Sequence, residues 1–344
     1  MKDGQGESKE RTPSGLDLLE AERARQHRDA LASFEGAAAP AARVAESLRR
    51  TGRLLLIGMG GSHFVARAVE PAYRARGIDA TAMVASELLA APFPDLPRTA
   101  ILTSQSGGSG EVLQYLDRPA GREERFAITL EASSALAQRI PALTGVGGTE
   151  RAFAATRSLM ICLSLHAAVI AALGEDQGPA LELLRRPLEL PVDAALAALA
   201  RKSAFIVSGR GSLAGLAEAG ALCLMELGRL PVMALEGGQF RHGPLEILTP
   251  SLGVILLRGR GEETTLTQRL VTTCGEAGAT PVVFDLSGEP ALEGGVTIAF
   301  PALEGFAAAF ALMPSLQRLM IDLAGRHVPR VGEPLRTSKV TGIE

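Results

Sequence analysis

The sequence predicts an α/β protein built from two tandem units, each with a parallel sheet between layers of helices. Apolar segments alternate with helical patterns along the chain, which is typical of βαβ units. The segments are apolar at every position rather than at every second one, as expected for strands covered on both faces. The plan also repeats: Ile57 to Ser62 aligns with Val207 to Ser212, and 207 − 57 gives an offset of 150 residues.

The elements of the two units follow in the same order. In the first unit, the strand RLLLIG runs into a glycine turn and a helix, and the strands ATAMVAS, TAILTSQS and RFAITLEA come after it. In the second, AFIVSG runs into a glycine turn and a helix, and MALE, GVILLRGR and TPVVFDLSG match the later strands. Each unit is therefore expected to be a three-layer αβα unit with a flavodoxin- or Rossmann-like sheet. The expected boundaries are 1–14 for a disordered tail, 15–50 for a helical segment interrupted at Pro40, 51–175 for the first unit, 176–200 for a linker helix, 201–326 for the second unit and 327–344 for a C-terminal tail.

Composition excludes several classes of protein. The net charge of −3 over 344 residues argues against a nucleic-acid partner, because phosphate-backbone binding leaves a basic footprint. The three cysteines have no metal-ligand spacing, and the N-terminus lacks the apolar core of a signal peptide. The longest apolar run, 158–174, is short for a membrane span and is expected to be a buried helix. We expect a soluble, cytoplasmic protein with no metal, cofactor or membrane partner.

Two loops rich in glycine and serine follow strands of the first unit. Ligands of open parallel sheets bind at the carboxyl ends of strands, where helix N-termini point their donors. Backbone N–H groups and hydroxyls can hold a phosphoryl group there without a lysine or arginine. The candidate residues are Gly60, Gly61 and Ser62 in the first loop and Ser104, Gln105, Ser106 and Ser109 in the second. The alternatives are serine-capped turns, or a degenerate dinucleotide fingerprint with Asp79 as the ribose-binding residue.

The second unit contains a candidate for proton transfer. Glu226 lies on an apolar helical stripe, where partial burial would raise its pKa and suit it to proton transfer next to a carbonyl. His242 stands before Gly-Pro and is placed by backbone geometry. A solvated glutamate and a structural histidine are the alternatives.

The order of these motifs resembles that of the sugar isomerase (SIS) domain family, and in particular the isomerase half of glucosamine-6-phosphate synthase. The resemblance covers about residues 43–344 and rests on GGS (60–62), SQSGGS (104–109), ATRS (155–158), GRG (209–211), ME (225–226), HGP (242–244) and TSKVTGIE (337–344). It implies a phosphosugar site without a cofactor, formed by the two serine and glycine loops and Ala155.

The resemblance also implies roles for three residues. Glu226 would move a proton between C1 and C2, and His242 would assist ring opening from the neighbouring subunit of a homodimer. Lys339, in the C-terminal tail, would meet the open-chain carbonyl. Each group suits aldose–ketose chemistry, which needs a base and a cation or imine that stabilises the enediol.

The sequence departs from that family on the helix of the expected base. Ala219 and Cys223 stand where the synthases carry a glutamate and a lysine, and Gln239 replaces an acidic residue before the histidine. No glutaminase domain is expected. The prediction is therefore isomerisation or deamination of a hexose or hexosamine 6-phosphate. A deglycase of a fructosamine-type 6-phosphate and a non-catalytic sugar-phosphate sensor remain the alternatives.

Overall fold

The structure, a computed structural model, describes residues 12–261 and 263–339; most of the predicted disordered tail lies outside this range. The N-terminal segment forms α1 (Gly15–Gly36) and α2 (Ala38–Thr51). Ser14 begins α1 with a capping box, in which it exchanges hydrogen bonds with Asp17. The break falls at Ala37 and not at the predicted Pro40. Proline is tolerated in the first turn of α2, because its missing N–H would have no helical partner there.

The first unit contains a five-stranded parallel sheet in the order β2-β1-β3-β4-β5. The strands are β1 (Arg53–Gly58), β2 (Asp79–Val84), β3 (Arg98–Thr103), β4 (Glu123–Thr129) and β5 (Ala142–Thr144). The helices that join them are α3 (Gly61–Arg74), α4 (Ala85–Ala90) and α5 (Gly110–Asp117). The first four strands confirm the sequence prediction.

The second unit repeats this topology, with its sheet in the order β10-β9-β8-β6-β7. Read from β7, the order matches that of the first sheet strand for strand, which confirms the internal repeat. Its strands are β6 (Ala204–Gly209), β7 (Val232–Glu236), β8 (Leu252–Arg258), β9 (Val282–Asp285) and β10 (Val296–Ala299), and its helices are α9 (Ser212–Gly228), α10 (Gly237–Arg241), the 3-10 helix η1 (Pro244–Ile247) and α11 (Glu263–Glu276).

Four further helices complete the described part of the chain. They are α6 (Arg157–Ala172), α7 (Gly178–Arg185), α8 (Asp193–Leu199) and α12 (Gly305–His327). The range 176–200, expected to hold one linker helix, holds the two short helices α7 and α8, because Pro187 and Pro191 interrupt it. Among the described helices, α12 has the length and apolarity of a membrane span, but 89% of its most apolar stretch is buried in the fold. The predicted buried helix 158–174 is α6, which is almost entirely buried.

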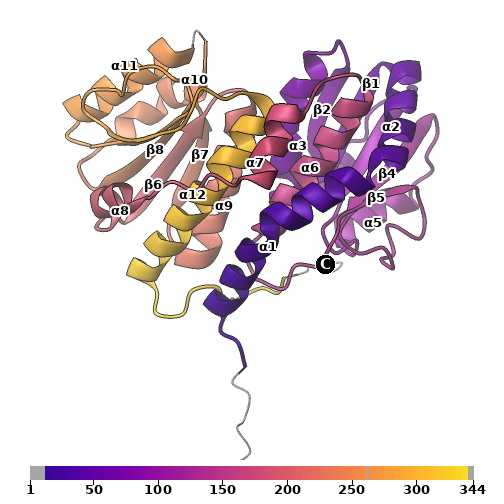
Figure 1. Cartoon of the computed structure of the whole chain (residues 1–344), viewed down its shortest axis with the longest axis horizontal. Coiled ribbons are helices and arrows are strands. Elements are labelled where there is room, and N and C mark those ends of the chain that lie inside the picture. Colours follow the sequence, from indigo (N-terminus) through magenta and orange to yellow (C-terminus); the bar gives the residue numbers. More distant parts are fainter. Residues whose placement is uncertain (1–11, 262, 340–344) are drawn as a thin grey trace, which may run out of the picture.

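The two sheets lie at opposite ends of the molecule with helices between them (Figure 1). Successive side chains of β1 point to different cores: Leu54 and Leu56 join the central core, whereas Leu55 packs under α4 and α5. In β6, Phe205 faces the same central core and Ile206 the outer one. Both units therefore share one central core, through α3, α6, α9 and α12.

The pseudo-equivalent helices α3 and α9 pack with almost no space between them. A Cβ on Gly215 of α9 would lie 2.3 Å from the backbone nitrogen of Ala68 and 2.6 Å from the carbonyl oxygen of Phe64, both in α3. Any side chain at position 215 would therefore force the two helices, and with them the two units, apart.

Gly215→Ala is expected to lower the urea midpoint of unfolding. The overpacking penalty of about 1–3 kcal/mol exceeds the gain of about 1 kcal/mol that alanine brings to a helix. The control is Gly275→Ala in α11, where a Cβ would meet no atom within 4 Å and where the midpoint should hold or rise. A midpoint that rises equally in both variants would show that α3 and α9 can separate freely.

Candidate active site

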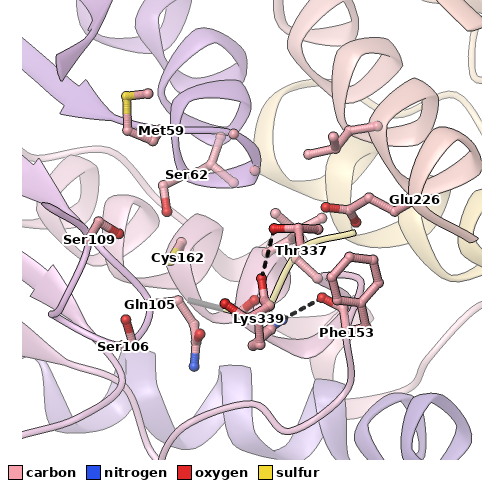
Figure 2. Close-up of a pocket in the computed structure, with 18 of the residues that line it drawn as sticks. Met59, Ser62, Gln105, Ser106, Ser109, Phe153, Cys162, Glu226, Thr337 and Lys339 are labelled. Carbon is pink, nitrogen blue, oxygen red and sulfur yellow. Dashed lines mark hydrogen bonds between the residues drawn. The ribbon is translucent and has the colours of Figure 1, made fainter. Parts of the chain in front are cut away.

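A pocket of about 330 Å³ opens at the carboxyl ends of β1 and β3, where α9 of the second unit and the C-terminal tail approach the first unit (Figure 2). It brings together nine of the eleven residues predicted for the site. These are Gly60, Gly61, Ser62, Gln105, Ser106, Ser109, Ala155, Glu226 and Lys339. They come from both units and from the tail, so the pocket exists only in the assembled chain.

The serine loop, residues 104–109, is held in shape by its own hydroxyls. Ser104 is buried and lies 2.9 Å, oxygen to oxygen, from Ser109, while the hydroxyl of Ser106 accepts from the N–H of Gly108 at 3.2 Å. Gly107 has φ +64, and a Cβ there would lie 2.1 Å from Ser134 Oγ, so only glycine fits. The loop therefore presents Ser106 and Ser109 to the pocket in a fixed arrangement, and Ser104 supports them from below.

Gln105 brings an unsatisfied donor to the same wall. Its backbone carbonyl accepts from Leu130 N at 3.0 Å and from Thr129 Oγ1 at 3.3 Å, which ties the loop to the end of β4. Its side-chain nitrogen is buried and has no hydrogen-bond partner among the described residues. A buried donor without a partner is costly, and an acceptor bound in the pocket would satisfy it.

Glu226 projects from α9 at the opposite side of the pocket (Figure 2). Burial raises its pKa to about 7; the nearby charge of Glu150 adds to the rise, and that of Lys339 opposes it. At neutral pH the carboxyl group is therefore divided between its two protonation states, as a group that both takes and returns a proton requires.

Lys339 reaches the pocket from the tail and is held by two contacts. Its Nζ donates to the carbonyl oxygen of Phe153 at 3.1 Å and lies 3.6 Å from Glu150 Oε2. Glu150 is fully buried. Burial disfavours its charge, but Lys339 and the hydroxyls of Ser158 and Thr156 hold its pKa below the usual value. The Glu150 carboxylate thus fixes an ammonium group at the pocket wall.

Glu150 is the main residue that sequence reasoning missed. Its carboxylate caps α6 by accepting from the backbone N–H groups of Thr156 and Arg157 at 2.9 and 2.8 Å. A capping box has a spacing of three, whereas Glu150 acts from six residues upstream of Thr156, so no local pattern reveals it.

The pocket walls formed by Phe153, Ser158, Cys162 and Thr337 were also not predicted. Burial raises the pKa of Cys162 to about 12, so this thiol is no nucleophile at neutral pH.

Two predicted site residues lie outside the pocket lining. Ser104 is buried beneath Ser109, as described above. His242 is exposed in the turn between α10 and η1 and does not line the pocket of its own chain. That His242 acts in the site of a neighbouring subunit stays a prediction.

In the described part of the chain, no three His, Cys, Asp or Glu side chains gather as a metal site would require.

Asp79 does not lie where the dinucleotide alternative requires its ribose-binding residue. Asp79 is the first residue of β2 and pairs in register with Arg53, the first residue of β1. Because these strands are parallel, Asp79 lies at the amino edge of the sheet, whereas the glycine turn lies at the carboxyl edge. Asp79 therefore cannot contact a ribose bound at that turn.

Comparison with known proteins agrees with the fold. The SIS domain family matches residues 198–317, which run from the end of α8 into α12 and include Glu226. The chain carries a SIS domain. It is also homologous to the isomerase part of glutamine–fructose-6-phosphate aminotransferase [isomerizing] from Gluconobacter oxydans (strain 621H). The two are 25% identical in an alignment 280 positions long, which covers 74% of this chain and 45% of that protein, so the chain spans less than half the length of this relative.

Solved structures share the whole fold, including the first unit that the SIS domain match does not cover. The C-terminal domain of glucosamine-fructose-6-phosphate aminotransferase from Francisella tularensis superimposes with a TM-score of 0.78 at 18% identity, over 94% of this chain and 98% of that one. Glucosamine-6-phosphate deaminase from Thermotoga maritima gives a TM-score of 0.74 at 20% identity, over 95% and 100%. The arrangement of the two units is therefore the fold of these two solved structures.

Proposed function

We propose that the protein is an enzyme that moves a proton between C1 and C2 of a hexose or hexosamine 6-phosphate, in an isomerisation or a deamination. The observation that carries the proposal is a single pocket with three parts. The serine loop, which has no charged side chain, faces the carboxyl group of Glu226, whose pKa is about 7, and the ammonium group of Lys339, which Glu150 holds in place. The loop accounts for a phosphate ester, and the two charged groups account for proton transfer next to a carbonyl.

The phosphate is assigned to the first unit. Ser62, Ser106 and Ser109 offer hydroxyls, and Gln105 offers the buried amide nitrogen that has no protein partner. The N-termini of α3 and α5 add backbone N–H groups and the positive ends of two helix dipoles. These neutral donors bind a phosphate without a strong countercharge, which leaves Lys339 free to act on the other end of the sugar.

The proton transfer is assigned to Glu226. In its ionised form the carboxylate takes the proton from one carbon, and in its protonated form it returns the proton to the next carbon. Lys339 stabilises the negative charge that develops on the enediol oxygen. His242 of the partner subunit would assist ring opening in a homodimer. If C2 carries an amino group, the same transfer converts the amine at C2 to an imine, and water then hydrolyses this imine to a ketose 6-phosphate and ammonia.

Solvent exchange tests this proposal without knowledge of the product. Fructose 6-phosphate, glucose 6-phosphate and glucosamine 6-phosphate are incubated with the protein in D₂O, and deuterium at C1 and C2 is followed by NMR. Ammonia and ketose phosphate are assayed in parallel, with the unphosphorylated sugars as controls. Deuterium uptake into the phosphorylated sugars alone is expected. Binding of these esters without uptake would favour a sensor, and release of an amino acid from a fructosamine 6-phosphate would favour a deglycase.

The rate of exchange is expected to rise with pH and to level off above about pH 7. Glu226 must be ionised to act as the base, so below its pKa of about 7 the rate should fall about tenfold per pH unit. Binding of fructose 6-phosphate over the same pH range corrects for ionisation of the substrate phosphate. A profile that is flat down to about pH 5 would assign the base to a group with an ordinary carboxyl pKa.

A further inference from the structure

The tail that carries Lys339 is attached to the rest of the chain at two places. After α12 it runs past the start of α1 and toward the first unit (Figure 1). Val331 and Gly332 are buried where it passes α1, and Lys339 is anchored at the pocket by Glu150 and Phe153. The five residues between Glu333 and Lys339, 334–338, are exposed. The attachments on either side therefore help to hold this exposed segment, of which Thr337 and Ser338 also line the pocket.

The first attachment includes a contact between two backbones. A Cβ on Gly15, the first residue of α1, would lie 2.3 Å from the carbonyl carbon of Gly332 and 2.7 Å from the carbonyl oxygen of Val331. A Cβ on Gly332 would in turn lie 2.7 Å from the carbonyl carbon of Gly15. Neither position has room for a side chain while the tail follows this path.

The same attachment includes a hydrogen bond from the helix of the proposed base. Arg229 ends α9, three residues after Glu226, and its Nη2 donates to the carbonyl oxygen of Glu333 at 2.9 Å. Arg229 is the one non-glycine residue with positive φ, +54, in the described part of the chain. Glycine is the usual residue in a left-handed conformation at a helix end. An arginine at this position strains the backbone but supplies a side chain that binds the tail.

We propose that Gly15 and Arg229 are positioning residues, which hold the tail so that Lys339 stays at the pocket. The inference rests on the proposed function only for its consequence on turnover. Lys339 follows Glu333 by 339 − 333 = 6 positions, so fixing Glu333 keeps the ammonium group within a short reach of Glu150. A tail that is free from residue 328 onward would have to lose more chain entropy to bring Lys339 to the same place.

Tryptic cleavage after Arg336 reports directly on the tail. Arg336 is exposed between the two attachments, and a protease can accept the segment only when it leaves its path. Loss of one hydrogen bond in Arg229→Gly is expected to speed this cleavage about fivefold, and overpacking in Gly15→Ala on the order of tenfold. Mass spectrometry of the released C-terminal fragment measures the rate.

Two controls separate the tail from general stability. Gly36→Ala makes the same substitution at the other end of α1, where a Cβ would meet no atom within 4 Å. Cleavage after Arg336 should keep the parental rate in this variant. In Arg229→Gly the left-handed conformation is kept but no longer strains the backbone, because glycine adopts it readily. The thermal midpoint of this variant is therefore expected to hold or rise while cleavage accelerates. A merely structural role for Arg229 would not combine these two results.

Kinetics completes the test. In both variants kcat for deuterium exchange into the phosphosugar should fall, while KM stays near the parental value because the phosphate loop belongs to the first unit. Unchanged cleavage in both variants overturns the proposal, and so does faster cleavage with an unchanged kcat. If the parent protein exchanges no proton with any phosphosugar, the proposed function fails. The cleavage rates alone then decide whether Gly15 and Arg229 hold the tail.

Discussion

Replacing Glu226 by glutamine is expected to reduce proton exchange into the phosphosugar on the order of a thousandfold. Glutamine keeps the shape of the side chain but can neither take nor return the proton. Binding of the same ester should remain close to the parental affinity, because the serine loop that is proposed to hold the phosphate belongs to the first unit and includes no residue of α9. Exchange by NMR in D₂O and calorimetric titration with fructose 6-phosphate measure the two quantities separately.

A matched control lies on the same helix. Glu218 of α9 also has a pKa raised by burial, but it lies 3.7 Å from Arg67 and outside the pocket lining. Glu218→Gln repeats the chemical change two turns away and should leave exchange near the parental rate. Exchange that survives Glu226→Gln, or that falls equally in both variants, would mean that Glu226 is not the base.

The elements that could be predicted from the sequence are those that local patterns determine. Strands buried on both faces must be apolar throughout, and the turns at their carboxyl ends carry glycine and serine, so β1, β3, β6 and β8 and the loops after β1 and β3 were recognisable. The edge strands β5 and β10 were not recognised. They contain only three and four residues, and most of these residues are half-buried, so neither length nor apolarity distinguishes them from loop.

The residues that complete the pocket depend on contacts between distant segments. Glu150 acts through α6 and through a lysine that follows it by 339 − 150 = 189 positions. The path of the tail depends on the absence of a side chain at Gly15, a position that reads in the sequence as an ordinary helix start. No spacing rule links such residues, and only the packing of the units brings them together. The repeat, by contrast, is a property of sequence order and could be read directly.

Lys339→Met is expected to lower exchange on the order of a hundredfold, because the enediol oxygen loses its cation. The pH at which exchange levels off should also move upward, because Lys339 opposes the rise in the Glu226 pKa. The rate against pH in D₂O measures both effects. Lys339→Arg keeps the charge with a planar group and should recover part of the rate.

The double variant Lys339→Met with Glu150→Gln distinguishes two explanations for that loss. Glu150 is buried and lies 3.6 Å from Lys339, so removal of the lysine alone leaves its carboxylate without a countercharge. If Lys339 only neutralises Glu150, the double variant should regain the parental rate and the parental pH profile. If Lys339 acts on the substrate, the rate should stay low although the buried charge is gone. We expect the second result, because Lys339 lines the same pocket as Glu226 and the serine loop.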